Sequence, residues 1–245
     1  AEEICEEGDI DDGRRPNTLD KDEIEALLDA AQRVNLQSPP TDCLSPIGEE
    51  LTLKGLKKEL NPEFTTAITR KPTVYGGNPF QVEVGLAWGG DIDEEGSYNE
   101  LRYANKVPLL YKKSACVTTK AIEEVSWNRY NISQTGNRPQ GPLYILVHIA
   151  SVWVPFTSEG KEAIANYDPI RNEMKLALQE AGRKLGKYLK RKERKEIQEK
   201  KKRQLTSYAK EMAPAIAQLA EEGNEAKIEN QIQKLVQDDY NPEQL

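Results

Sequence analysis

In this chain of 245 residues, apolar side chains recur at helical spacing in some segments and at every second position in others. Near the N-terminus, apolar side chains recur every three or four positions, which predicts an amphipathic helix over residues 20–35. The helix start has a capping box, because the Asp20 side chain can accept a hydrogen bond from the third helical amide while the Glu23 side chain reaches back to the backbone amide of Asp20. A second helix is predicted from Ser45-Pro46 to about Leu60, since proline is tolerated in a first helical turn.

From residue 63 the period changes to two. Short alternating runs predict sheet strands, and a longer apolar run predicts a buried strand that ends near Val154. A helix with one apolar side and a loop rich in Gly, Pro and Asn lie between them. Strands with two helices on one face make an α+β domain. The predicted strands cover residues 65–70, 80–88, 101–107 and 143–154, the helix covers 114–125, and the loop covers 131–142.

A long helix is predicted from about Lys161, because an apolar stripe runs at helical spacing from Ile164 to Tyr188. The stripe fades after Leu189. Residues 183–203 hold twelve Lys or Arg and three Glu, which predicts a helical arm. A solvated charged face is the favoured interpretation of this arm, and contact with DNA phosphates is the alternative.

The apolar period returns in residues 205–245 and predicts two short helices separated by Gly223-Asn224. Because short amphipathic helices are marginal in water, these would dock on a partner protein or fold back on each other or on the long helix. Their apolar positions are Met212, Ile216, Leu219, Ile228, Ile232, Leu235 and Val236.

Composition narrows the possible functions. A net charge of -7, a charged fraction of 31% and a mean hydropathy of -0.73 indicate much solvated surface and argue against a protein that coats nucleic acid along its whole length. No apolar run is long enough to span a membrane, so a cytoplasmic protein is expected. The chain opens without methionine, which suggests a fragment of a longer polypeptide.

The sequence holds no complete catalytic set. Cys5, Cys43 and Cys116 form no Cys-x-x-Cys pair, and no acidic cluster has metal-ligand spacing, so no metal site is predicted. The single histidine, His148, lies in the buried strand and is expected to be a hydrogen-bonded core residue. A phosphate-binding Gly-x-x-x-x-Gly-Lys loop is absent as well.

One segment between the buried strand and the long helix does carry chemistry. PFTSEGKE, residues 155–162, places Lys161 on a short loop after Gly160, and a lysine there is a flexible point charge that can reach a phosphate. The segment resembles the switch-lysine loop in the transducer domain of ATP-driven type II topoisomerases. Three further segments resemble the B subunit of archaeal DNA topoisomerase VI, a type IIB enzyme: PPTDCLSPIGEE at 39–50, RKPTVYGGNPFQVEVG at 70–85 and RYANKVPLLY at 102–111.

The resemblance implies an organisation. Residues 1–62 would be the C-terminal part of a helix-two-turns-helix module, 63–160 a transducer sheet of the ribosomal S5 domain 2 type, 161–204 the transducer helix and stalk arm, and 205–245 a docking tail. A GHKL (Bergerat) ATPase domain that holds ATP and Mg²⁺ would precede them. Lys161 would touch the terminal phosphate of that ATP, and this chain alone would be inactive.

A second candidate site is Trp127-Asn128-Arg129-Tyr130, where aromatic and basic residues interleave as in surfaces that hold DNA phosphates. It resembles the family's Trp-Lys-x-Tyr DNA-contact motif, with Asn128 in place of the lysine. The alternative is structural, with Trp127 as a core residue at a helix end and Tyr130 as a turn anchor.

The function implied by the resemblance is mechanical. The chain would couple ATP binding and hydrolysis to cleavage and passage of double-stranded DNA by the topoisomerase VI A subunit, within an A2B2 heterotetramer associated with the nucleoid. The B subunits would pair through the ATPase domain. Two alternatives remain: a B-like scaffold of a meiotic-type DNA-breaking complex that no longer uses ATP, and a general nucleic-acid-binding interaction protein on an S5-like domain.

Overall fold

The computed structural model describes residues 1–34, 39–93, 96–219 and 224–239. The chain divides into two compact units, Ala1–Thr41 and Asp42–Leu245, and each is described by itself.

The first unit is helical. It contains α1 (Glu2–Glu7), the short 3-10 helix η1 (Pro16–Thr18) and α2 (Lys21–Arg33), and α1 packs on α2 around the buried Ala30. The predicted capping box is confirmed: Glu23 N donates to Asp20 Oδ1 at 2.9 Å, and Asp20 N donates to Glu23 Oε2 at 2.9 Å.

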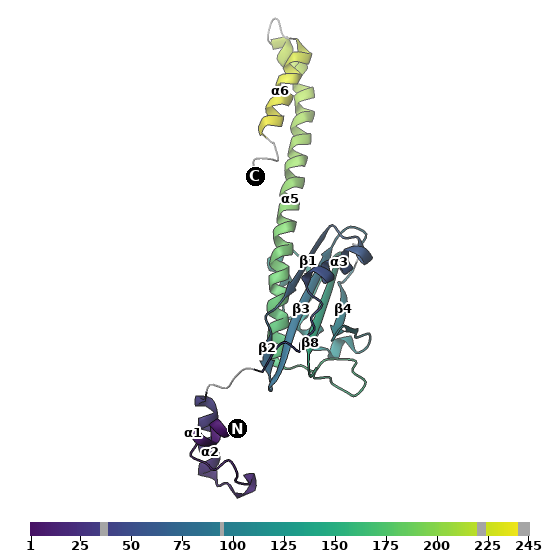
Figure 1. Ribbon diagram of the computed structural model, residues 1–245. Coiled ribbons are helices and arrows are strands. Elements are labelled where there is room, and N and C mark those ends of the chain that lie inside the picture. The colour runs from purple at the N-terminus through teal and green to yellow at the C-terminus, as the bar shows by residue number, and fades with distance from the viewer. Residues whose placement is uncertain (35–38, 94–95, 220–223, 240–245) are drawn as a thin grey trace. The chain divides into compact units, whose positions relative to one another are not determined.

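The second unit is built on a mixed sheet with strand order β1-β3-β8-β4-β5, in which β2 also pairs with β3 (Figure 1). Only β4 and β8 run parallel; the other pairs in this sheet are antiparallel. The four predicted strand regions are confirmed, with small shifts at their ends. The strands are β1 (Phe64–Thr69), β2 (Thr73–Tyr75), β3 (Asn78–Trp88), β4 (Asn99–Ala104), β5 (Val107–Pro108) and β8 (Leu143–Ser151).

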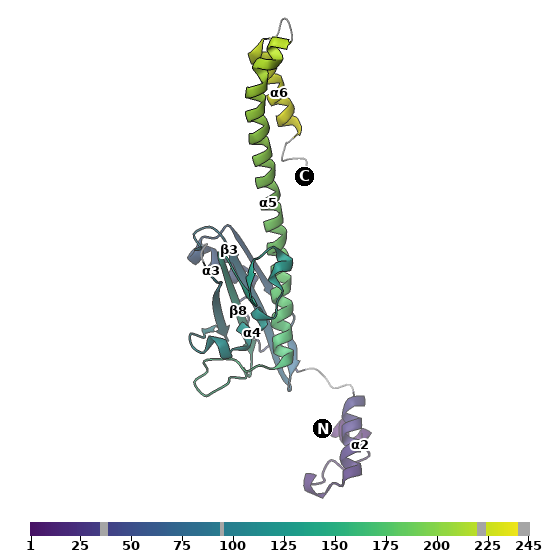
Figure 2. The ribbon, with the colours of Figure 1, turned by 180° about the vertical axis from the view of Figure 1, so that it is seen from behind.

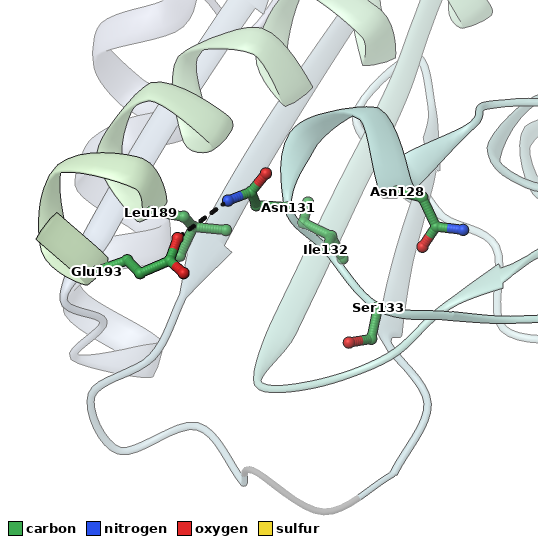
Figure 3. Close-up of a pocket in the computed structure, with 6 residues that line it drawn as sticks. All are labelled: Asn128, Asn131, Ile132, Ser133, Leu189 and Glu193. Atoms are coloured by element: carbon green, nitrogen blue, oxygen red, sulfur yellow. Dashed lines mark hydrogen bonds between the residues drawn. The ribbon is translucent and has the colours of Figure 1, made fainter. Parts of the chain in front are cut away.

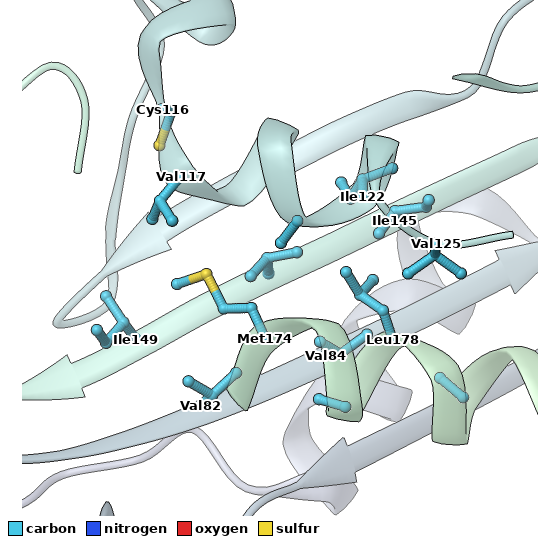
Figure 4. Packing of buried hydrophobic residues seen from close by; sticks show 14 of the residues in the cluster. Val82, Val84, Cys116, Val117, Ile122, Val125, Ile145, Ile149, Met174 and Leu178 are labelled. Atoms are coloured by element: carbon cyan, nitrogen blue, oxygen red, sulfur yellow. The ribbon is translucent and has the colours of Figure 1, made fainter. Parts of the chain in front are cut away.

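Both faces of this sheet are covered. The larger core lies under α4 (Val117–Glu123) and the first half of α5 (Asp168–Leu219), where Val82, Val84 and Ile145 meet Met174 and Leu178 (Figure 4). A smaller core lies on the opposite face under α3 (Glu49–Leu60). The expectation that helices cover a single face was therefore incomplete, because α3 was assigned to a separate module.

Two features place α3 on the sheet. It begins at Glu49 rather than at Ser45-Pro46, with Gly48 at its N-cap, and Leu56 is buried against the sheet. Gly85 of β3 makes room for it, since an added Cβ would lie 2.8 Å from side-chain atoms of both Thr52 and Leu56. The boundary between the two units thus falls after Thr41, whereas the sequence placed a boundary at residue 62.

The long helix α5 starts at Asp168, seven residues later than predicted. Ile164 and Tyr167 continue the helical spacing in the sequence but belong to the preceding loop. Ile164 is fully buried there, forms an isolated β-bridge with Phe156, and its carbonyl accepts from Val117 N at 3.0 Å. These backbone contacts replace the first predicted helical turns, and Pro169 stands in the first turn of the helix that follows, a position where proline is tolerated.

α5 is one helix of 52 residues that passes through the predicted arm without a break. Beyond the sheet, α6 (Glu225–Asp239) packs back along its distal part (Figures 1 and 2), where Ala209 and Ala213 are buried. Among the described residues, the tail contains one short helix, α6, instead of the two predicted, and α6 folds back on the long helix, which was the alternative to docking on a partner. None of the helices in the described ranges is long and apolar enough to cross a membrane.

Candidate functional site

The segment that carries Lys161 is a narrow loop with an anchored base. Thr157 N donates to Ala163 O at 2.9 Å, and Ala165 N donates to Pro155 O at 2.7 Å, so the two arms of the loop pair across its base. Ala163 and Ile164 have no exposed surface. The loop therefore stands on the core, and residues 157–161 between its arms are exposed.

Lys161 lies at the tip of this loop and is exposed. Its backbone is left-handed, with φ at 51°, and its amide donates to Ser158 O at 3.1 Å. A lysine in this conformation is uncommon and marks a tight turn. No ion pair of Lys161 occurs within the described ranges, so its ammonium group is available to a ligand from outside.

A buried polar network supports the sheet next to this loop. The Glu83 carboxylate accepts from the backbone amides of Ile47 and Gly48, both at 2.7 Å, and from the Thr69 hydroxyl at 3.0 Å. It also accepts from His148 Nδ1 at 2.7 Å, and His148 Nε2 accepts from Lys106 N at 3.0 Å. This pattern requires a neutral imidazole with its proton on Nδ1. His148 is fully buried, as predicted for a hydrogen-bonded core residue.

The network holds Glu83 in its charged form. Burial alone would raise the pKa of this carboxyl, but the hydrogen bonds from His148, Ile47 and Gly48 outweigh burial, and the net pKa is lowered. The neighbouring turn is fixed as well, because Asn105 exchanges two hydrogen bonds with Ser151, each at 2.9 Å, at the end of β8.

The second candidate, Trp127–Tyr130, forms the 3-10 helix η3, and its two aromatic residues are structural. Trp127 is fully buried, and its Nε1 donates to Ile122 O at 2.9 Å. It therefore occupies the core position that the structural alternative describes, and its ring is not accessible to DNA.

Tyr130 anchors η3 to α5. A Cβ added at Gly182 would lie 2.7 Å from the Tyr130 ring, and one added at Gly186 would lie 3.0 Å from the Tyr130 carbonyl oxygen. The two glycines are four residues apart and so lie on one side of the helix. The absence of two side chains lets η3 approach α5 closely.

The two middle residues of the motif, Asn128 and Arg129, are exposed. Asn128 lines a hollow of about 440 Å³ between η3 and α5 (Figure 3). On its far side Asn131 Nδ2 donates to Glu193 Oε2 at 3.4 Å. Asn128 and Arg129 are thus the exposed residues of the motif, Tyr130 is half-buried, and contact of this segment with DNA stays a prediction.

Next to η3, α5 presents a cationic face that the residue count alone did not reveal. At 100° per residue, nine basic side chains fall within about 140° of the helix circumference over about 29 Å, while all three glutamates of the arm fall outside this arc. Eight of the nine are exposed and none has an ion pair in the part of the chain that the structure describes. They are Arg183, Lys184, Lys187, Lys190, Arg191, Arg194, Lys195, Lys201 and Lys202.

Tyr130 packs on α5 beside one edge of this cationic face, because at 100° per residue Gly186 lies about 40° from Lys190 and the arc extends away from there. Lys192 is different: it lies on the side of α5 that faces the sheet and pairs with Glu63 at 2.7 Å. That hydrogen bond lowers the pKa of Glu63 and raises the pKa of Lys192. The structure does not bring Lys161 to this surface, since the residues around the Lys161 loop and those around η3 line separate hollows.

The described residues contain no group of three or more His, Cys, Asp or Glu side chains that could hold a metal ion. They offer ATP and Mg²⁺ a single lysine on a loop, which fits a contact to a phosphate and does not amount to a nucleotide pocket.

Comparison with known proteins shows to which protein family this chain belongs. The family model described as "Topoisomerase VI B subunit, transducer" matches residues 39–202, which include the sheet, the Lys161 loop, η3 and the cationic part of α5. The chain therefore belongs to the family of topoisomerase VI B-subunit transducers.

Similar curated proteins are named as the B subunit of type 2 DNA topoisomerase 6. The protein from Methanococcoides burtonii is 47% identical over 89% of this chain, and that from Archaeoglobus fulgidus is 47% identical over 79%. The aligned parts are 35% and 32% of those proteins, so the chain spans about a third of their length. Among solved structures, the DNA gyrase B subunit from Myxococcus xanthus is 17% identical, covers 54% of this chain and 38% of its own, and has a TM-score of 0.36, too low to bear on function.

Proposed function

We propose that this chain is the transducer region of a topoisomerase VI B subunit, which couples ATP binding and hydrolysis to cleavage and passage of double-stranded DNA by the A subunit. The observation that supports this most is the family match over residues 39–202, since it includes both an exposed loop lysine and the long helix that follows it. In this proposal the sheet unit is of the ribosomal S5 domain 2 type.

Lys161 is the nucleotide sensor in this proposal. ATP and Mg²⁺ are held by a GHKL ATPase domain of the complete B subunit, and the Lys161 ammonium meets the terminal phosphate when that domain closes on the loop. A positive group placed there offsets charge that develops on the transferred phosphoryl group. The exposed tip and the core-anchored arms of the loop suit this role, because the lysine is accessible while its base is fixed.

α5 is the lever. Only six residues separate Lys161 from Asp168, and α5 then continues without interruption for 52 residues. Its first half is packed into the core through Met174, Leu178 and Leu185. A displacement of the sheet unit is therefore carried to the distal end of the helix, where the A subunit would dock.

Double-stranded DNA is proposed to lie against Asn128, Arg129 and the cationic face of α5. Unpaired lysines and arginines on one helix side can replace counterions along a phosphate backbone without reading sequence. The expected binding is weak, indifferent to sequence and strongly dependent on salt.

The distal helical hairpin is proposed to contact the A subunit within an A2B2 heterotetramer, in which the B subunits pair through the ATPase domain. Ile216, Ile228 and Ile232 are only half-buried in the hairpin. Met212, Leu219 and Leu235 are 55%, 85% and 65% exposed and form the apolar contact expected for such a partner. The fold-back of α6 thus uses part of the apolar surface and leaves part of it for docking.

Lys161→Ala tests the proposal in a complete B subunit, where this chain follows an ATP-binding domain of the family. ATP turnover at saturating ATP should fall by a factor that corresponds to about 2 to 4 kcal/mol of barrier. Lys71→Ala, which removes another exposed lysine, should leave turnover unchanged. Wild-type turnover in Lys161→Ala would reject the role of Lys161.

The two alternatives predict other results. A scaffold of a meiotic-type DNA-breaking complex would bind its DNA-cleaving partner but give no turnover even with Lys161 intact. A general nucleic-acid-binding protein would bind DNA through α5 and form no stable complex with the A subunit.

A further inference from the structure

β4 carries two buried charged residues that the proposed function does not explain. Arg102 is 5% exposed, and its Nη2 donates to the Tyr111 carbonyl at 2.9 Å. The Glu100 side chain has no exposed surface and pairs with Lys113 Nζ at 3.5 Å. The Thr118 and Thr119 hydroxyls complete the shell of Glu100 with hydrogen bonds of 2.9 Å each. Both charges therefore act on one short stretch, residues 111–113.

Buried charges are costly, and apolar residues in their place are often at least as stabilising. Arg102 and Glu100 fix the positions of Tyr111 and Lys113, the residues on both sides of Lys112. Lys112 itself is held in a left-handed conformation, with φ at 52°. Its side chain is 54% exposed, so the clamps act on its backbone neighbours and leave its ammonium group free to reach outward.

The Lys112 ammonium reaches the Lys161 loop. Its Nζ lies 2.6 Å from Glu162 Oε2, and Glu162 directly follows Lys161. Tyr111 and residues of the preceding stretch 104–110 enclose a hollow of about 370 Å³ with Phe156, Gly160, Lys161 and Glu162 of the loop. The ion pair is thus a direct side-chain link between the clamped segment and the tip of the loop.

We propose that Lys112 and Glu162 are positioning residues for Lys161, and that their ion pair is a latch that holds the loop in the position from which Lys161 meets the nucleotide. The proposal rests on the proposed role of Lys161 as nucleotide sensor. The pair also neutralises a carboxylate beside a lysine that must meet phosphate, where an unpaired negative charge would repel the ligand. Because both partners are partly exposed, the ion pair is weak, and its loss should displace only a fraction of the loops.

Hydrogen exchange of the chain without nucleotide tests the latch. Lys112→Met should raise the exchange rate of amides in residues 158–162 about twofold to fivefold, the range expected when an exposed ion pair is lost. The difference should vanish in about 1 M salt, where charges on the surface are screened. Glu123→Gln is the matched control, because it breaks the Arg138–Glu123 pair of 2.8 Å on α4 and should leave the loop unchanged.

A charge exchange separates the ion pair from other effects of the substitutions. Lys112→Glu combined with Glu162→Lys should restore slow exchange, whereas each single change should not. Fast exchange in the double variant, or wild-type exchange in Lys112→Met, would overturn the latch.

The positioning role is tested by steady-state ATP turnover in the complete B subunit. Lys112→Met should raise KM for ATP about twofold to fivefold with little change in kcat, because a smaller fraction of loops is in the binding position. Lys161→Ala should instead lower kcat. If Lys161→Ala abolishes turnover while Lys112→Met has wild-type KM, the positioning role fails and the sensor role stands. If Lys161→Ala has wild-type turnover, the sensor role fails and the positioning role fails with it.

Discussion

The two candidate contact regions of the sheet unit are supported by different interactions. β8, which leads into the Lys161 loop, carries His148 paired with Glu83 of β3, and the buried Glu100 and Arg102 of β4 hold the segment whose Lys112 pairs with Glu162 of the loop. The Trp127–Tyr130 turn is held mainly by packing, with an indole in the core that also donates one hydrogen bond to Ile122 O, and with a tyrosine ring against two glycines. The first region should therefore respond to charge and pH, and the second to changes in side-chain size.

The largest expected effect concerns the second region. Trp127→Ala should lower the free energy of unfolding by about 3 to 5 kcal/mol, the usual cost of a large cavity in a core. Denaturant titration measures it. Arg129→Ala, two residues away on the same turn, should change stability by less than about 0.5 kcal/mol because its side chain is exposed. Equal losses for the two variants would contradict the division into anchors and contacts.

Glu83→Gln should have the next largest effect, on the order of 3 kcal/mol at pH 7, because it leaves buried donors without an acceptor. The pH dependence follows from the lowered pKa of Glu83. The carboxylate stabilises the fold fully above the ordinary glutamate pKa of 4.5, and this contribution is lost as the pH falls through the lower folded value.

Unfolding curves between pH 7 and pH 3 check this expectation. The wild type should lose stability more steeply below pH 4.5 than Glu83→Gln does, so the gap between the two should narrow. A constant gap over this range would mean that the Glu83 charge contributes nothing.

Gly182→Ala should cost about 1 to 3 kcal/mol, because the added methyl group would meet the Tyr130 ring at 2.7 Å. The expected result is a lower midpoint of thermal unfolding and a displaced η3. Gly55→Ala is a suitable control, since a Cβ on that helical glycine has nothing within 4 Å and alanine favours a helix. A variant with wild-type stability would show that α5 can shift away from Tyr130 at no cost.

The smallest effect is on DNA binding. Arg129→Ala should reduce the slope of log affinity against log salt by about 0.9, which corresponds to one phosphate contact. Lys190→Ala on the cationic face of α5 should do the same, while Lys71→Ala should not. Binding measured at several salt concentrations with two unrelated duplexes would also reveal any sequence preference, which the account does not expect.

Much of this architecture could be predicted from the spacing of apolar residues along the chain. The strands, the capping box of α2 and the buried His148 follow from local patterns. The first residue of α5 could not be predicted in this way. Ile164 and Tyr167 continue the helical spacing, but they lie in a loop whose backbone pairs with other segments. The placement of α3 was missed for a related reason: its apolar side fits a partner far away in the sequence, where Gly85 makes room for it.

The candidate sites divide in the same way. Lys161 could be singled out because a strand, a short polar loop and a glycine precede it. The roles within Trp127–Tyr130 could not be assigned, since a tryptophan followed by polar residues suits a core as well as a DNA surface. The glycine pair at 182 and 186 is a signal that could have been used, because two glycines four apart in a long helix indicate close approach by another element.

One crossed measurement tests the central claim that exposed residues of the two regions do separate work on separate ligands. In the complete B subunit bound to its A subunit, ATP turnover without DNA and the salt slope of DNA binding are measured for Lys161→Ala and Arg129→Ala. Lys161→Ala should lower turnover and keep the slope, and Arg129→Ala should keep turnover and reduce the slope by about 0.9. If either variant changes both quantities as much as the other does, the claim is contradicted.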